Sequence, residues 1–212
     1  MDKTLQALLM TDYAAYCSYV HRGMWTPSRF HKYLCYTVQG FLEEKTGHAL
    51  DILIISCPPQ HGKSITITET LPSWYFGRNP DHRVIEISYN EDFAQKFGRR
   101  NRFKIKEFGE IFGIETAKSP DSNTEFELSN NIGGMISRGV LSGVTGNPAN
   151  LMIIDDPIKT REEADSETTR DKIWDEGLNS FRSRLARGGK VILIMTPRKE
   201  EEFAGRIIKH GK

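Results

Sequence analysis

Short apolar runs and longer amphipathic stretches alternate along the chain. The run at 52–56 lacks polar alternation, which is typical of a strand in a parallel sheet covered on both faces. Between such runs, apolar residues return at the three- and four-residue intervals of a helix. We predict strands at 52–56, 84–88, 151–155 and 191–195, and helices at 2–20, about 28–45, 63–76, 91–108 and roughly 165–186.

Two predicted helices have recognisable ends. Ser28 follows a Trp-Thr-Pro break and is suited to cap the helix that starts there. We expect Gly188 and Gly189 to close the last helix. The apolar residues that place this helix fall at i, i+4, i+7 and i+11: Trp174, Leu178, Phe181 and Leu185.

The segment 109–150 is rich in glycine, serine and asparagine, and its short runs at 125–128 and 134–137 predict a hairpin inside the domain. Elsewhere, strands alternate with helices, which predicts an α/β fold with a mostly parallel central sheet flanked by helices. We expect an N-terminal helical region over 1–50 that covers the site, and a core over 51–212.

The loop after the first strand carries the clearest chemistry. Residues 57–64 read CPPQHGKS, close to the GxxxxGK[ST] pattern, with Cys57 in place of the first glycine. Such a loop directs backbone N–H groups at a polyphosphate. Lys63 would reach the β- and γ-phosphates of ATP, and Ser64 would bind Mg²⁺. The predicted nucleotide contacts are Pro59, Gln60, His61, Gly62, Lys63, Ser64 and Ile65.

An acidic pair follows the strand at 151–155. Asp155 is placed to hold Mg²⁺ with Ser64, and Asp156 to orient the attacking water. The alternative is a chance Gly-Lys-Ser turn, which would require the preceding strand and this acidic pair to be accidents as well. Since the carboxyl ends of parallel strands meet at one edge, we expect Lys63, Asp155 and Thr196 to converge.

Composition indicates an ordinary globular protein, with 38% hydrophobic and 27% charged residues. No run approaches the ~20 apolar residues of a membrane span, and the N-terminus lacks a signal region. We therefore expect no membrane contact and no secretion. Cys17, Cys35 and Cys57 follow no metal-ligand spacing and are expected to be reduced cytosolic thiols.

The formal net charge is only +1, but basic residues gather at 99–106 and 182–190. A solvated helix face would explain either cluster alone. Two clusters on one nucleotide hydrolase make a nucleic-acid partner an equally good interpretation.

Three blocks have the order and spacing of one known family: PPQHGKS at 58–64, GVLSGVTGNPANLMIIDDP at 139–157 and RLARGGKVILIMTPRKEEEFAGRII at 184–208. The last two are more specific than the nucleotide-binding motifs. On these blocks, the chain resembles the N-terminal ATPase domain of the large terminase subunit of tailed bacteriophages, the motor that pumps DNA into the capsid.

The resemblance implies an ASCE-type P-loop ATPase that uses ATP and Mg²⁺. Thr196, in a Met-Thr-Pro motif, would sense the γ-phosphate and couple hydrolysis to DNA movement; a strand-end cap is the alternative for this hydroxyl. The adenine would lie near 25–31, although Trp25 and Phe30 would serve equally well in the core.

The partners implied by the resemblance are double-stranded DNA, other copies of the chain in a ring, a portal and a small terminase subunit. The protein would work in the host cytoplasm. Full-length large terminases continue into an RNase H-like nuclease domain with an acidic metal cluster. The chain has no candidate for that cluster, so we expect a truncated chain or an isolated motor domain, and no DNA cleavage.

Two positions depart from the family pattern. Relatives often carry an arginine in the loop where this chain has Gln60, so an arginine finger would come from elsewhere. Arg138 is the candidate, donated to a neighbouring subunit, with Arg99 and Arg100 as alternatives. Many relatives also have glutamate where this chain has the shorter Asp156, which would hold the water slightly differently, or another acid such as Glu162 would assist.

Two other functions remain open. A helicase-like ATPase shares the nucleotide motifs, but the block at 184–208 argues against it. An assembly module that binds ATP with little turnover of its own is compatible with the missing loop arginine.

Overall fold

The computed structural model describes residues 1–48, 50–142, 148–158, 166–173 and 183–196. Within this part of the chain, one seven-stranded sheet has the order β1-β7-β6-β2-β5-β4-β3. The first five strands in this order pair in parallel, and β4 and β3 add an antiparallel edge. The strands are β1 Leu50–Ser56, β2 Arg83–Ser88, β3 Thr116–Asp121, β4 Glu125–Leu128, β5 Gly134–Gly139, β6 Ala149–Asp155 and β7 Leu185–Met195.

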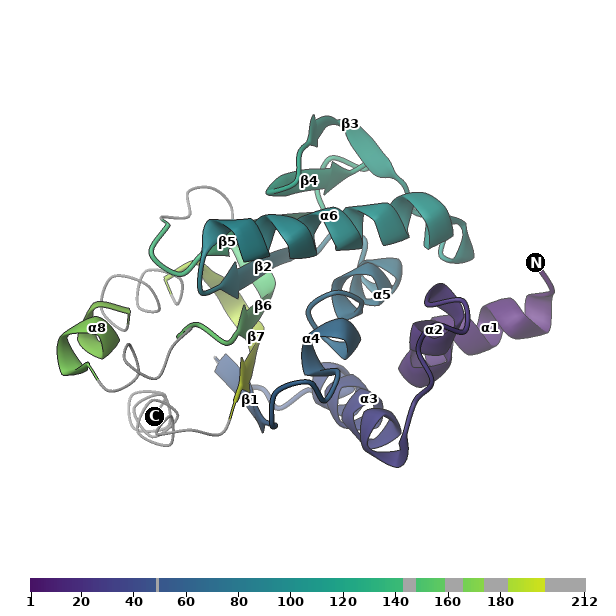
Figure 1. Cartoon of the computed structure of the whole chain (residues 1–212). Helices are drawn as coiled ribbons and strands as arrows, with labels where there is room; N and C mark the ends of the chain where they lie inside the picture. Colours follow the sequence, from purple (N-terminus) through teal and green to yellow (C-terminus); the bar gives the residue numbers. More distant parts are fainter. Residues whose placement is uncertain (49, 143–147, 159–165, 174–182, 197–212) are drawn as a thin grey trace.

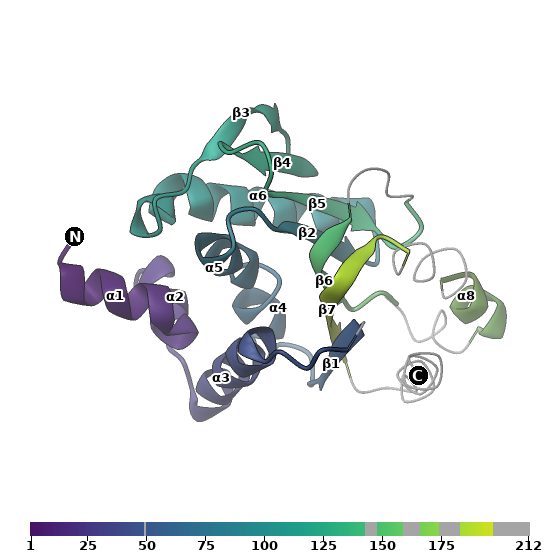
Figure 2. The same ribbon diagram turned by 180° about the vertical axis from the view of Figure 1, so that it is seen from behind.

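Helices cover the sheet unequally. Figures 1 and 2 show α1 to α6 on one side of the sheet and α8 on the other. The helices are α1 Lys3–Thr11, α2 Tyr13–Val20, α3 Arg29–Glu43, α4 Lys63–Thr66, α5 Leu71–Arg78, α6 Glu91–Phe108, the short 3₁₀ helix η1 Gly109–Ile111, and α8 Glu167–Lys172. The α/β fold with a mostly parallel central sheet is confirmed.

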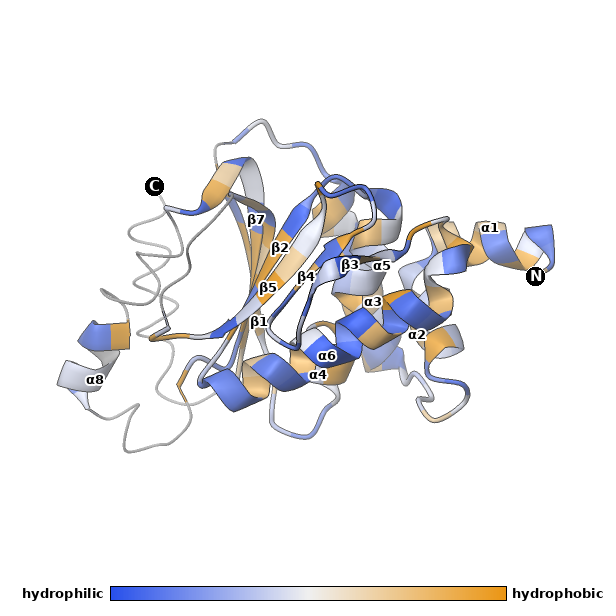
Figure 3. Cartoon of the chain, turned by 90° about the horizontal axis from the view of Figure 1, so that it is seen from above, coloured by the Kyte–Doolittle hydropathy of each residue, from blue (hydrophilic) through white to orange (hydrophobic). Residues whose placement is uncertain are grey.

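Two apolar clusters lie on opposite faces of the sheet because side chains alternate along each strand. On β6, Leu151 and Ile153 join the larger cluster with Trp74 of α5 and residues of α1 to α3. Met152 and Ile154 belong to the second cluster, which includes Ile158 and Ile173. Figure 3 shows the apolar residues concentrated on the strands and on the helix sides that face them.

The strands at 84–88, 151–155 and 191–195 and the helix at 91–108 are confirmed, as is the hairpin formed by β4 and β5. The helix that begins after Ser28 is also confirmed, and Ser28 accepts the N–H of His31. Strand β3 was not predicted. It pairs with β4 through an irregular register.

Several predicted boundaries are wrong for local reasons. The helix expected over 2–20 is two helices, because the side chain of Asp12 accepts the N–H of Ala15 and starts α2. The helix expected over 63–76 is interrupted between α4 and α5. Strand β1 lies at the sheet edge with most residues only half-buried, so it is not covered as fully as its apolar run indicated.

The last predicted helix is also wrong at its end. Leu185 begins β7, and Gly188 and Gly189 lie inside that strand instead of closing a helix. Gly188 has a φ of +73°, and the pairing of β6 with β7 shifts register nearby, between Ala149 and Leu151. Trp174, Leu178 and Phe181 lie outside the described residues.

The helices of 1–50 share their core with the sheet domain, since Trp74 donates its indole N–H to the carbonyl oxygen of Leu9 at 3.0 Å. The division at residue 50 stays a prediction. Of the described helices, none is long and apolar enough to cross a bilayer.

Candidate nucleotide-binding site

The loop at 57–64 joins β1 to α4 and turns through two residues with left-handed backbone, Gln60 at φ 63° and Gly62 at φ 73°. At Gly62 a Cβ would lie 2.6 Å from Nε2 of His31. Both the conformation and the closeness of the His31 ring therefore favour glycine there. His31 also donates from Nε2 to the carbonyl oxygen of His61 at 3.0 Å, so α3 braces the loop.

Cys57 stands where the family pattern has its first glycine, and the fold accommodates it. Its side chain is buried, and its N–H donates to the carbonyl oxygen of Met195 at 3.0 Å. Burial raises the pKa of the thiol, which makes it a packing group instead of a nucleophile. With cysteine in place of glycine, the loop keeps its backbone hydrogen bond to β7.

Three predicted site residues meet at the carboxyl edge of the sheet. Lys63 is only 5% exposed, and its Nζ lies 2.7 Å from Oδ2 of Asp156. Lys63 also donates to the hydroxyl of Thr196, which lies 3.1 Å from both carboxylate oxygens of Asp156. The start of α4 and the ends of β6 and β7 thus bring a cation, an acid and a hydroxyl into mutual contact.

Asp156 reaches this position through a sharp turn. Its φ is +41°, an unusual value for a residue other than glycine, and its N–H donates to the carbonyl oxygen of Ile194 at 2.9 Å. A non-glycine residue held in this region costs about 1–3 kcal/mol, and such outliers concentrate at functional sites.

Asp155 lies beside this cluster on the helix-covered face of β6, and it is 4% exposed. Its Oδ2 accepts a hydrogen bond from Thr68 at 2.7 Å. Burial raises the pKa of Asp155 to about 6, although the nearby hydroxyls of Thr68 and Ser64 oppose the shift. The predicted metal pair, Ser64 and Asp155, therefore lies close enough to interact.

The residues present fit a magnesium ion shared with a phosphate. Oδ1 of Asp155 is buried and has no hydrogen-bond partner among the described residues, which leaves one hard oxygen ligand free. Magnesium commonly binds one or two protein oxygens and completes its shell with phosphates and water. Within the described part of the chain, no group of three or more His, Cys, Asp or Glu residues forms a metal site made by protein alone.

The remaining predicted nucleotide contacts lie in the loop and at the start of α4. Pro59 accepts a hydrogen bond at its carbonyl oxygen from Nδ1 of His61 at 2.8 Å. Ile65 lies in α4 and is 38% exposed. Trp25, near the expected adenine position, is a buried core residue, whereas the ring of Phe30 lies 6.5 Å from that of His61.

Arg138 is not brought to Lys63. It lies on β5 with its guanidinium 3.7 Å from Glu91 and 4.0 Å from Glu125. It also donates to the carbonyl oxygen of Ser137 at 3.2 Å. Its role as a finger stays a prediction, and Glu162, the other proposed helper, lies outside the described residues.

Most of the basic cluster on α6 is engaged within the chain. Arg100 pairs with Glu69, and both Arg102 and Lys106 pair with Asp121. Lys104 is 7% exposed, and burial lowers its pKa to about 8.

Of the second basic cluster, Lys190 donates to the carbonyl oxygens of Phe41 and Glu44, whereas Arg182 lies outside the described residues. The basic runs in the sequence therefore overstate how much positive charge the fold leaves free.

Sequence reasoning missed two buried polar residues beside the site. Thr68 is fully buried and holds Asp155. Glu86 of β2 is also fully buried and accepts a hydrogen bond from Ser88. Burial raises its pKa well above the usual range, and the nearby Asp155 raises it further. The sequence does carry a signal for Glu86, because a glutamate inside an apolar strand is unusual. It carries no comparable signal for Thr68.

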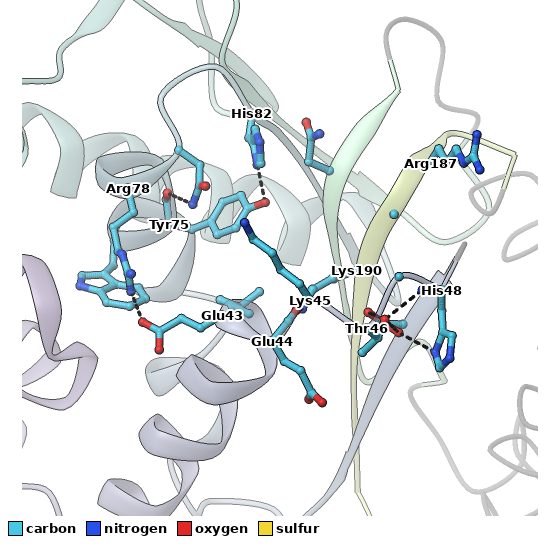
Figure 4. Close-up of a pocket in the computed structure, with 17 residues that line it drawn as sticks. Glu43, Glu44, Lys45, Thr46, His48, Tyr75, Arg78, His82, Arg187 and Lys190 are labelled. Atoms are coloured by element: carbon cyan, nitrogen blue, oxygen red, sulfur yellow. Dashed lines mark hydrogen bonds and ion pairs between the residues drawn. The ribbon is translucent and has the colours of Figure 1, made fainter.

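A large hollow lies away from this cluster. It has a volume of about 880 Å³ and is lined by residues near the amino ends of β1 and β7, including Asp51 and Lys190. Figure 4 shows its internal pairs, among them Arg78 with Glu43. In open α/β sheets, ligands bind at the carboxyl ends of the strands, so size alone does not mark the site.

Fold and site together define a helix-flanked α/β domain whose strand ends converge on one loop. The chain belongs to the terminase large subunit family: the model of the T4likevirus-type N-terminal region matches residues 54–208.

The fold is similar to the crystal structure of the HK97 bacteriophage large terminase, with a TM-score of 0.57 and 13% sequence identity. The match covers 89% of this chain and 38% of that one. No curated protein matches the chain by sequence.

Proposed function

We propose that this chain is the ATPase motor domain of a DNA-packaging terminase. It would hydrolyse ATP with Mg²⁺ and use the energy to move double-stranded DNA into a procapsid. The observation that carries the proposal is the contact of Lys63 with Asp156 and Thr196 beside the Ser64–Asp155 pair. Family membership supports the packaging role over the helicase-like alternative.

The loop supplies the binding surface for the triphosphate. Its two left-handed residues, Gln60 and Gly62, form a tight turn of the kind that can direct backbone N–H groups at an anion. Lys63 then adds a buried positive charge at the end of the loop. A phosphate oxygen would compete with the carboxylate of Asp156 for that ammonium.

This competition gives Asp156 its role. As long as Lys63 and Asp156 are paired at 2.7 Å, the carboxylate is occupied. Once phosphate takes the ammonium, Asp156 is free to accept a hydrogen bond from water and orient it for in-line attack. Its side chain is 31% exposed, so water has access to it.

Thr196 would report the state of the site. Its hydroxyl contacts both Lys63 and Asp156, so any exchange of their partners changes its own hydrogen bonds. Because Thr196 directly follows the last residue of β7, that change would pass to the residues that come after it. Magnesium, held by Ser64 and Asp155, would neutralise charge on the phosphates.

Calorimetry with a non-hydrolysable ATP analogue and Mg²⁺ tests binding, and a phosphate-release assay tests turnover. We expect Lys63→Ala to lower turnover by at least about 10²–10³-fold, because a charge stabilising the transition state is lost. The circular dichroism spectrum should stay unchanged.

Lys118→Ala, at an exposed lysine of β3, is the matched control and should keep wild-type turnover. Residual hydrolysis by Lys63→Ala near the control rate would defeat the assignment.

A second candidate is an assembly module that binds ATP with little turnover of its own. The pairing of Arg138 with Glu91 and Glu125 favours it, since Arg138 is then not free to act within the same chain. The site would be completed by a neighbouring copy in a ring.

A further inference from the structure

Asp155 is held by one hydrogen bond on one oxygen. Thr68 donates from Oγ1 to Oδ2 at 2.7 Å, whereas the buried Oδ1 has no partner among the described residues. The carboxyl group is 4% exposed, so water has little access to correct its orientation. Thr68 therefore determines which carboxylate oxygen is presented to a ligand.

Thr68 reaches Asp155 because the helix after Lys63 is interrupted. The α4 helix ends at Thr66, and α5 starts at Leu71. Between them, the N–H of Glu69 donates to the carbonyl oxygen of Ser64 at 2.9 Å. This five-residue interval is wider than that of an α-helix, and such π-type turns recur at functional sites.

The wide turn is clamped from two sides. On one side, Asn101 of α6 donates from Nδ2 to the carbonyl oxygen of Thr68 at 2.7 Å, and Arg100 pairs with Glu69. On the other, the hydroxyl of Tyr13 donates to the carbonyl oxygen of Thr66. Asn101 and Tyr13 are fully buried, so these bonds are protected from competing water.

We propose that Thr68 is a positioning residue for the metal-binding carboxylate of Asp155, and that Asn101 fixes Thr68 from α6. The inference rests on the proposed function, because it assigns a role to Thr68 only if Asp155 binds Mg²⁺. Two successive hydrogen bonds of 2.7 Å, from Asn101 to Thr68 and from Thr68 to Asp155, then link α6 to the site. A shift of α6 would move the carboxylate.

The test is equilibrium binding of a fluorescent ATP analogue to the whole chain, first in EDTA and then at increasing MgCl₂. Thr68→Val keeps the side-chain shape and removes the hydroxyl. We expect the half-saturating Mg²⁺ concentration to rise about tenfold, as for other groups that orient a metal ligand. Binding in EDTA should be unchanged, and Thr68→Ser should restore the wild-type Mg²⁺ dependence.

Thr66→Val is the matched control. Thr66 is an equally buried threonine in the same segment, but its hydroxyl has no hydrogen-bond partner among the described residues. The inference is overturned if Thr68→Val and Thr66→Val show the same Mg²⁺ dependence, or if Thr68→Val lowers only the melting temperature.

If Thr68→Val does not fold, Thr68→Ala against Thr68→Ser makes the same comparison, because the two side chains differ by one hydroxyl. Failure of the wild-type chain to bind nucleotide under any condition would instead remove the proposed function itself.

Discussion

Two buried lysines, one at the carboxyl edge of the sheet and one on α6, have different electrostatic surroundings in this fold. Lys63 is 5% exposed and has the carboxylate of Asp156 at 2.7 Å. Lys104 is 7% exposed, and no carboxylate of the described residues lies within ion-pair distance of it. Its pKa falls to about 8 because burial disfavours the charged form and Arg100 adds repulsion.

The difference shows what each region is built to do. At the sheet edge, the buried cation has a counter-ion that a phosphate could replace. On α6, Arg100, Arg102 and Lys106 serve internal pairs, and Lys104 lies buried at a cost to stability. Basic residues that look alike in sequence therefore belong to the proposed nucleotide site in one place and to the framework of the fold in the other.

The largest expected effect on ATP turnover is that of Arg138→Ala. Arg138 lies on β5 and pairs with Glu91 at the start of α6. If Arg138 acts as a finger in a neighbouring copy, Arg138→Ala should lower ATP turnover by about 10³-fold. Turnover of the wild-type chain should rise faster than linearly with protein concentration. Arg102→Ala, an α6 arginine paired with Asp121, is the control. Equal turnover by both variants would assign Arg138 to the framework.

Lys104→Met should stabilise the chain. Because the folded-state pKa of Lys104 is about 8 against an ordinary value of 10.5, the folded chain holds this proton less tightly than the unfolded chain. The penalty is complete below pH 8 and disappears as the pH rises through the unfolded value.

Urea unfolding at pH 7 should show a gain of up to about 3 kcal/mol for Lys104→Met, and the gain should be absent near the ordinary lysine value of 10.5. The pKa of His21 offers a second readout by NMR. Burial and the charges of Lys104 and Arg100 lower it to about 4, so it should rise in the variant. A gain that does not depend on pH would contradict this account.

Asp156→Asn should have a smaller effect on stability than Lys104→Met. It leaves Lys63 buried without its counter-ion, but Asp156 is 31% exposed, so we expect a loss of only about 1–2 kcal/mol by urea unfolding. Saturating ATP analogue should shrink the loss, because phosphate would replace the carboxylate.

Glu43→Gln breaks the more exposed pair with Arg78 and should cost at most about 1 kcal/mol, with no response to nucleotide. Identical behaviour of the two variants would mean that the Lys63 pair is an ordinary surface pair.

The local sequence pattern predicted the elements that depend on interactions between residues close together in the sequence. The apolar runs located β2, β6 and β7, and the helix at 91–108 was predicted with its observed ends. Pattern failed where a single side chain or tertiary contact decided the outcome. Asp12 split the first helix by capping the second, and pairing with β6 drew Leu185 into a strand although its spacing was helical.

The candidate site divides in the same way. The sequence alone determined which loop, which acids and which threonine lie at strand ends, because motif spacing and strand polarity are local properties. Only the tertiary structure decided which of them touch. Lys63 and Thr196 are 133 residues apart in sequence, and the Thr68–Asp155 bond depends on a turn clamped by α6. Contacts across such separations follow from how the layers pack, which no local pattern records.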